Sequence, residues 1–306
     1  MISIKLKRLI KEGYLDIRDF GLRVGLARWN CILCDESLVS IQRKNQAILK
    51  KLEREYSELL EKYRDCKESE LKSENAPIWM LWWDGELPEV LKMCYNSRMK
   101  HAGKHRIVVI TKENVHEYVT FPDYVWQQFE SGKLRIQHLA DMIRVQLLRN
   151  YGGLWLDASV YCSTDIPEHI FSMPLYSLSG KPDPRFVSNN RWTTFVIGGY
   201  KNNVLCSFLD DFFQEYCHRG KRFIDYFMFD CAIALAYNSI TAVRTAVDDL
   251  PYEDGDCYLL DRSLDEQIED IMLPVFSKIS WGRFCNREAK IDTLYARLLH
   301  EEGIHG

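Results

Sequence analysis

The chain has 306 residues, of which 46% are hydrophobic and 27% are charged, and its formal net charge is −4. This composition is typical of a globular protein with a sizeable core, and the weakly acidic balance gives no indication of nucleic-acid binding. No apolar run approaches the ~20 residues that span a bilayer, and the N-terminus lacks the apolar core of a signal peptide. We therefore expect a cytoplasmic protein whose ten cysteines are reduced thiols.

Residues 1–75 are expected to form a helical extension. The first 30 residues mix Lys and Arg with Ile, Leu and Val, which is a basic amphipathic pattern. Such a segment could make a peripheral contact with an anionic membrane surface, and docking on the main domain as an ordinary helix is an equal alternative. From Ser37 to Lys72 there is no Gly or Pro, and apolar residues recur at near-helical spacing, which predicts one long amphipathic helix.

Residues 76–306, which begin beside Pro77, are expected to form one α/β domain. Apolar runs predict buried strands at 78–83, 105–110 and 154–156, and the periodicity between them predicts helices at 87–98, 121–129 and 134–150. Farther along, a strand and a glycine turn are expected within 189–203, followed by helices at 204–217 and 223–237. Strands that alternate with helices predict a mainly parallel sheet covered by helices on both faces.

The stretch NYGGLWLDASVY, from Asn150 to Tyr161, places polar groups directly after a predicted strand. Asp157 follows the apolar run, and Ser159 lies two residues on. Ligands of open parallel sheets bind beyond the carboxyl ends of the strands, where a carboxylate and a hydroxyl can hold Mg²⁺ or Mn²⁺. Taken alone this is a weak indication, because many strands end in an Asp that starts a turn.

The helix before this strand carries Asp141 and Arg144, which are three residues apart and therefore neighbours on the helix surface. Taken alone, such a pair is typical of a solvated ion pair. Together with Tyr151-Gly152-Gly153, the apolar strand and Asp157-Ala158-Ser159, however, it resembles the pattern D-x-x-R, helix, Y-G-G, strand, D-x-D of glycosyltransferase family 32. The greatest similarity is to its bacterial capsular polysaccharide synthesis proteins. The resemblance covers about residues 76–285 and is strongest over 134–162.

The resemblance implies a GT-A fold, which is Rossmann-like, and a nucleotide-sugar donor. Asp141 and Arg144 would hold hydroxyls of the donor sugar and orient the glycosyl phosphate, and Gly153 would lie in the donor site. Asp157 would contact the donor and, with the second acidic residue of the motif, a divalent Mn²⁺ or Mg²⁺. Ser159 occupies that second position, and a neutral hydroxyl is a weaker ligand than a carboxylate. Whether the metal is held is therefore an open expectation.

Further donor contacts are implied at both ends of the resemblance. In PIWMLWWDG, Trp82, with Trp83 as the next choice, would stack on the uracil of the donor. Asp225 would face the acceptor or the transferred sugar, with an ordinary helix-start Asp as an equal alternative. In VFSKISWGRF, Ser280 would add a metal contact and Trp281 would cap the leaving group, the alternative being a buried Trp.

The sequence favours a retaining glycosyltransferase that moves a hexose from a nucleotide-diphosphate sugar, UDP-sugar first, to a glycan or lipid-linked glycan in capsular or surface polysaccharide synthesis. Its catalytic candidates are Asp141, Arg144, Asp157 and Asp225. One alternative is a metal-dependent phospho- or nucleotidyltransferase. Such an enzyme would need further acidic ligands near a phosphate-binding glycine loop, and the sequence shows no such loop. The other is a non-catalytic GT-A-like scaffold of a capsule assembly complex, against which the intact Asp141, Arg144 and Trp82 argue.

Overall fold

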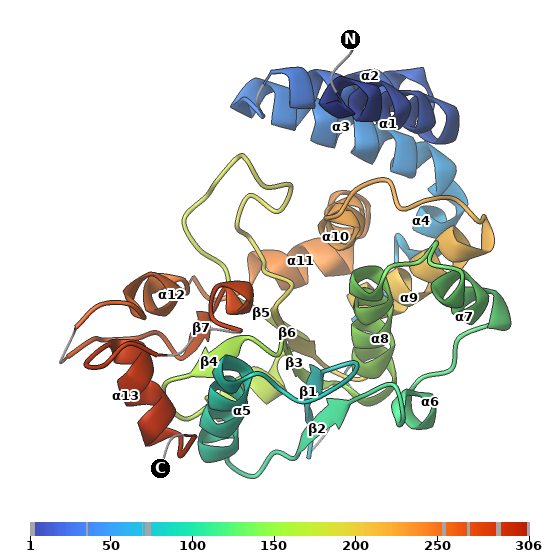
Figure 1. Ribbon diagram of the computed structural model, residues 1–306. Helices are drawn as coiled ribbons and strands as arrows, with labels where there is room; N and C mark the ends of the chain where they lie inside the picture. Colours follow the sequence, from blue (N-terminus) through green and yellow to red (C-terminus); the bar gives the residue numbers. More distant parts are fainter. Residues whose placement is uncertain are drawn as a thin grey trace.

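The computed structural model describes residues 4–34, 36–68, 70, 75–252, 255–267, 270–285 and 289–304, with side chains from residue 11 onward. Figure 1 shows a helical layer, formed by the N-terminal part of the chain, that lies over one side of an α/β body. The basic N-terminal segment was predicted to contact a membrane surface. The side chains of its residues 1–10 lie outside the described ones, so this contact stays a prediction.

The helical layer contains four helices, and two of them lie where one long helix was expected. They are α1 (Ile4–Phe20), α2 (Leu22–Leu33), α3 (Leu38–Glu55) and α4 (Ser57–Tyr63). The prediction of a single helix from residue 37 to 72 is wrong because Tyr56 leaves the helical conformation, with φ −116° and ψ 23°. Its ring is buried against Phe212, with 4.5 Å between the ring centroids. A tertiary contact therefore overrides the uninterrupted helical pattern of the sequence.

The body is built on a five-stranded sheet in the order β2-β1-β3-β6-β5. Its strands are β1 (Ile78–Leu81), β2 (Ile107–Ile110), β3 (Gly153–Leu156), β5 (Leu175–Ser177) and β6 (Val196–Gly199). β1 pairs in parallel with β2 and β3, whereas β6 pairs antiparallel with β3 and β5. Four strands of this sheet therefore run in one direction and β6 is reversed, which confirms the predicted mainly parallel α/β arrangement. β4 (Val160–Cys162) and β7 (Phe276–Lys278) form a separate antiparallel pair.

Helices of the body connect the strands and cover both faces of the sheet (Figure 1). Those before β6 are α5 (Glu89–His101), α6 (Val115–Tyr118), α7 (Asp123–Glu130), α8 (Ile136–Tyr151) and the 3-10 helix η1 (Glu168–Ser172). After β6 follow α9 (Val204–His218), α10 (Met228–Ser239), α11 (Thr241–Asp248), α12 (Leu259–Ser263), η2 (Trp281–Arg283) and α13 (Leu294–Glu301). The helices expected at 87–98, 121–129, 134–150 and 204–217 are confirmed within about three residues, which is the usual uncertainty of helix ends.

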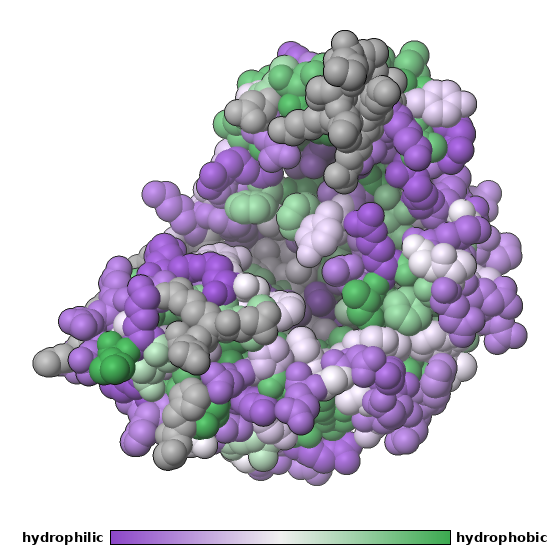
Figure 2. Space-filling model, viewed as in Figure 1, coloured by the Kyte–Doolittle hydropathy of each residue, from purple (hydrophilic) through white to green (hydrophobic). Residues whose placement is uncertain are grey.

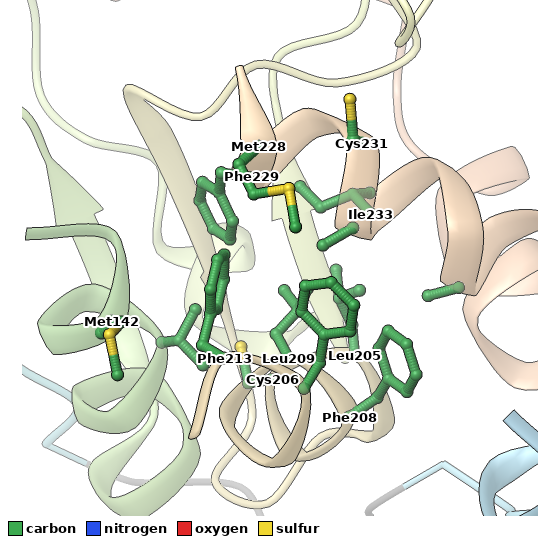
Figure 3. Packing of buried hydrophobic residues seen from close by; sticks show 14 of the residues in the cluster. Met142, Leu205, Cys206, Phe208, Leu209, Phe213, Met228, Phe229, Cys231 and Ile233 are labelled. Carbon is green, nitrogen blue, oxygen red and sulfur yellow. The ribbon is translucent and has the colours of Figure 1, made fainter. Parts of the chain in front are cut away.

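Side chains alternate between the two faces of each strand, and this divides the core. Trp79, Trp155 and Ile197 face the cluster that contains α8, α9 and α10. Ile78 and Leu154, their neighbours in sequence, face the opposite cluster with η1. On the first side, Figure 3 shows Met142, Phe213 and Phe229 from three different helices converging in the core. Residues of α3 and α4 belong to this same cluster, so the helical layer and the body share one core.

Candidate active site

Asp157 directly follows β3 and is the centre of a group of charged side chains. Its Oδ1 accepts hydrogen bonds from Trp155 Nε1 at 2.8 Å and from Arg144 Nη2 at 3.1 Å. Its Oδ2 lies 2.8 Å from Nζ of Lys278. Burial alone would raise the pKa of Asp157, but the charges of Lys278 and Arg144, with these hydrogen bonds, hold it well below its usual range. Asp157 is therefore ionised, with a cation on each carboxylate oxygen.

Arg144 connects Asp157 to the helix before it. The residue is 5% exposed, and its guanidinium donates to the carbonyl oxygen of Thr194 as well as to Asp157. Nη2 lies 3.6 Å from Oδ1 of Asp141, and the guanidinium lies over the Trp155 ring, 4.7 Å from its centroid. The structure thus brings Asp141, Arg144 and Asp157 together, as the 16-residue step between the two acids implied.

Asp230 joins this group from the first turn of α10. Its Oδ1 accepts a hydrogen bond from Trp192 Nε1 at 3.0 Å. Burial, followed by the nearby negative charge of Asp141, raises the pKa of Asp230 to about 7 despite that hydrogen bond. The carboxyl group of Asp230 therefore holds its proton to a higher pH than an ordinary Asp does. A buried carboxyl whose pKa is shifted in this way is typical of functional sites.

Asp225 lies elsewhere, although it is only five residues away in sequence. Its Oδ2 is 3.2 Å from Nη1 of Arg28 on α2 and 3.2 Å from Nζ of Lys44 on α3. The helix expected from residue 223 begins at Met228. Asp225 is therefore outside the first turn and is held by the helical layer, so the geometry gives its predicted role toward the acceptor no support.

The two tryptophans expected at the donor lie next to each other. Trp82 follows β1, and its ring packs edge to face against Trp281, with 5.8 Å between centroids. Trp82 Nε1 donates to the Gly85 carbonyl at 3.2 Å, and Trp281 is 40% exposed. Trp83 instead packs on Phe129 beside the main core, with 5.3 Å between centroids. Trp82 and Trp281 are therefore better placed than Trp83 to form an accessible aromatic surface.

Two of the predicted metal ligands, Asp157 and Ser280, have protein partners in the structure. Ser159 is buried, and its carbonyl accepts from the Ile279 N–H at 2.9 Å. Ser280 instead bonds Asp261, with its Oγ 3.1 Å from Oδ2. Across the part of the chain that the structure describes, no three His, Cys, Asp or Glu side chains form a group that could hold a metal. Mg²⁺ and Mn²⁺ prefer about six oxygen ligands. The Asp157 carboxylate, whose two oxygens already contact Arg144 and Lys278, does not fit the ligand set that these metals prefer.

Gly153 has a role in the backbone rather than at the donor. It is the first residue of β3, so it lies at the opposite end of the strand from Asp157. Its φ is +101°, and a Cβ at this position would lie 2.2 Å from the carbonyl oxygen of Pro77. The neighbouring Leu154 N–H donates to that same oxygen at 3.0 Å. The prediction of Gly153 in the donor site is therefore corrected: glycine is needed here so that β3 can pair closely beside β1.

The elements that carry these side chains border a hollow. Figure 2 shows the molecule hollowed between the region of α10 and the region of α12 and β7. The side chains of Asp157 and Lys278 keep exposed fractions of 28% and 21% within otherwise buried surroundings. Asp157 and Lys278 are therefore partly accessible to solvent.

Comparison with known proteins places the chain in a family. The sequence profile of the capsular polysaccharide synthesis proteins matches residues 32–292. The chain belongs to this family. Over 115 residues it is also 28% identical to inositol phosphoceramide mannosyltransferase 3 of Schizosaccharomyces pombe (strain 972 / ATCC 24843), a match that covers 37% of the chain and 31% of the relative. The chain thus spans about a third of the length of that curated relative.

Among solved structures, the PaToxG glycosyltransferase is similar over 67% of this chain and 87% of the other chain, with 12% identity and a TM-score of 0.32. A likeness of that size supports no argument. The matched family region includes the whole charged group, from Asp141 to Lys278. Within the described residues of this family member, no helix is long and apolar enough to cross a membrane.

The raised pKa of Asp230 predicts that the stability of the protein depends on pH. Its carboxyl titrates at about 7 when folded and at about 3.8 when unfolded, so the folded state binds more protons between these values. Its contribution to stability is therefore lost as the pH rises from about 4 to about 7. We expect Asp230→Asn to gain stability over the wild type across this range, by roughly 1–3 kcal/mol at pH 8.

Urea unfolding of both proteins at several pH values between 5 and 8 measures this gain. The charged groups that face Asp230 are Asp141 and Arg144 of α8, so the pH profile of Asp230→Asn reports on this one cluster. A stability difference that stays constant over that range would contradict the assignment.

Proposed function

We propose that the protein is a GT-A-type retaining glycosyltransferase that moves a hexose from a nucleotide-diphosphate sugar, with UDP-sugars as first candidates, to a glycan or lipid-linked glycan acceptor of capsular or surface polysaccharide synthesis. Family membership and the name of the mannosyltransferase relative support sugar transfer. The observation that carries the proposal is the charged group of Asp141, Arg144 and Asp157 beyond the carboxyl end of β3, where open α/β sheets bind their ligands.

Each member of the group can be given a task in sugar transfer. The developing negative charge on the leaving diphosphate requires fixed cations, and Arg144 is a buried guanidinium whose position is set by contacts on two sides. Asp141 and Asp230 offer two carboxyl groups beside it, and the raised pKa of Asp230 lets that group donate hydrogen bonds to sugar hydroxyls as well as accept them. In the proposal, the flat rings of Trp82 and Trp281 bind the nucleotide base.

The test is binding and turnover of nucleotide sugars by the full chain. A panel of UDP-, GDP- and other nucleotide sugars is screened by thermal shift and by slow donor hydrolysis. We expect one donor class to raise the melting temperature and to be hydrolysed. Asp141→Asn should reduce that hydrolysis about 100-fold, because the carboxylate beside Arg144 is lost.

Glu58→Gln, an exposed carboxylate on α4, is the control variant and should hydrolyse the donor at the wild-type rate. If no nucleotide sugar changes either the melting temperature or the rate of hydrolysis, the transferase proposal is wrong, and the scaffold alternative is left. If Asp141→Asn hydrolyses the donor as fast as the wild type does, the location of the site is wrong.

A further inference from the structure

The position of Lys278 is fixed by backbone pairing on both sides. It is the last residue of β7 and lies opposite Val160 of β4 in the antiparallel register. Its N–H donates to the Cys257 carbonyl at 2.7 Å, and the next residue, Ile279, donates to Ser159. The side chain crosses the Phe195 ring, with Nζ 5.2 Å from the ring centroid, and ends 2.8 Å from Oδ2 of Asp157. Lys278 is therefore placed beside Asp157 by the fold and not by a flexible loop.

The turn from Leu156 to Val160 is surrounded by three basic side chains. Arg98, fully buried on α5, donates to the carbonyls of Leu156, Asp157 and Val160. Arg144 and Lys278 hold the Asp157 carboxylate. Against these three positive charges stand the carboxylates of Asp157 and of Asp141, which lies 3.6 Å from Arg144. The charge balance at the turn is therefore positive.

A positive balance decides which ligand the turn favours. A divalent cation at the Asp157 carboxylate would lie close to both Lys278 and Arg144, and like charges at such short distances repel one another. A diphosphate, in contrast, would be attracted by the same two groups. The hydroxyl of Ser159, which replaces the second acid of the motif, adds no negative charge that would shift the balance toward a metal.

We infer that Lys278, acting with Arg144, supplies the positive charge on the leaving diphosphate that a divalent metal would otherwise supply, so that transfer does not require a metal ion. This inference rests on the proposed function. In the reaction, the bond between the sugar C1 and the diphosphate oxygen breaks, and its electron pair stays on that oxygen beside Lys278 Nζ. The acceptor hydroxyl oxygen forms the new bond to C1, and its proton passes to the released diphosphate.

The experiment uses the full-length protein and the donor identified in the screen above. Turnover is measured in excess EDTA and in added Mn²⁺, and binding of the free nucleoside diphosphate is measured by calorimetry in EDTA. We expect wild-type turnover to change less than about 2-fold between the two conditions. Lys278→Met, which keeps most of the side-chain length, should lower kcat about 10²- to 10³-fold and weaken diphosphate binding in EDTA about 10-fold or more, and Mn²⁺ should restore neither.

The matched control is Lys51→Met. Lys51 also ends 2.8 Å from a carboxylate, that of Glu55, and its side chain is similarly covered, at 15% exposed against 21% for Lys278. This variant should bind and turn over the donor like the wild type. Lys278→Arg keeps the positive charge. Compared with Lys278→Met, it should recover part of the diphosphate binding and part of kcat, which a purely structural role for Lys278 does not predict.

The outcomes separate this inference from the proposed function. If the wild type neither binds nor hydrolyses any nucleotide sugar, the transferase proposal fails. If the wild type hydrolyses a donor only with Mn²⁺ and loses diphosphate binding in EDTA, the transferase stands and the role of Lys278 is overturned. The wild-type comparison decides this question even if Lys278→Met does not fold.

Discussion

Replacing Arg144 with methionine is expected to lower donor turnover by about 10²- to 10³-fold, the usual effect of losing one preorganised charge donor at a reacting group. The same change should destabilise the fold by about 3–5 kcal/mol, because it breaks a buried ion pair. The guanidinium is 5% exposed and bonds both the Thr194 carbonyl and Asp157. Steady-state kinetics and urea unfolding measure the two effects separately.

Arg149→Met is the control for Arg144→Met. Arg149 lies on the same helix and also contacts two carboxylates, Asp210 at 2.5 Å and Asp211 at 3.1 Å, but it is not part of the charged group. We expect this variant to lose stability while the remaining folded protein turns over donor normally. If Arg144→Met loses only as much activity as Arg149→Met at equal folded fraction, Arg144 is a structural residue and the assignment of the site is wrong.

Replacing Gly153 with alanine is expected to destabilise the protein by about 4 kcal/mol or more, in the range that only severe packing or backbone conflicts reach. Two costs add at this position. The φ of +101° is unfavourable for alanine, and the new Cβ would lie 2.2 Å from the Pro77 carbonyl oxygen. The clash is with backbone and cannot be relieved by a rotamer change, so the pairing of β3 with β1 must open. Urea unfolding followed by tryptophan fluorescence measures the loss.

Gly103→Ala separates strain from clash. Gly103 also has a positive φ, +57°, but open space lies where the Cβ would be added. We expect this control to lose only about 1 kcal/mol, the usual cost of a non-glycine residue in this conformation. Equal losses in Gly153→Ala and Gly103→Ala would show that β3 has room to move, against the close pairing described above.

The parts of the site that lie close in sequence were found through their resemblance to a family motif, and local rules explain the geometry of that motif. The step from Asp141 through the Gly-Gly turn to Asp157 crosses one helix end and one short strand, and local rules fix the geometry of both. The same local rules predicted most helices of the body. The long helix from residue 37 was not divided correctly, because the contact of Tyr56 with Phe212 joins positions 156 residues apart.

The remaining site residues could not be located from the sequence alone. Lys278 reaches Asp157 only because β7 pairs with β4, a pairing between segments more than 100 residues apart. Asp225 was preferred to Asp230 because its Asp-Tyr-Phe segment resembles one in the family. Ion pairs of Asp225 with Arg28 and Lys44 instead tie it to the helical layer, and α10 presents Asp230 to the site. Ion pairs with the helical layer therefore separate Asp225 from the role that the sequence suggested for it.

The shared core has a consequence for how the chain folds during synthesis. Apolar side chains of α3 and α4, such as Ile48 and Leu60, are buried in the same cluster as those of α9 and α10. The ribosome produces α3 and α4 about 150 residues earlier than the helices that cover them. Their apolar faces stay open to water, or to a chaperone, until roughly two-thirds of the chain has emerged. The helical layer, although first in sequence, is thus completed among the last parts of the fold.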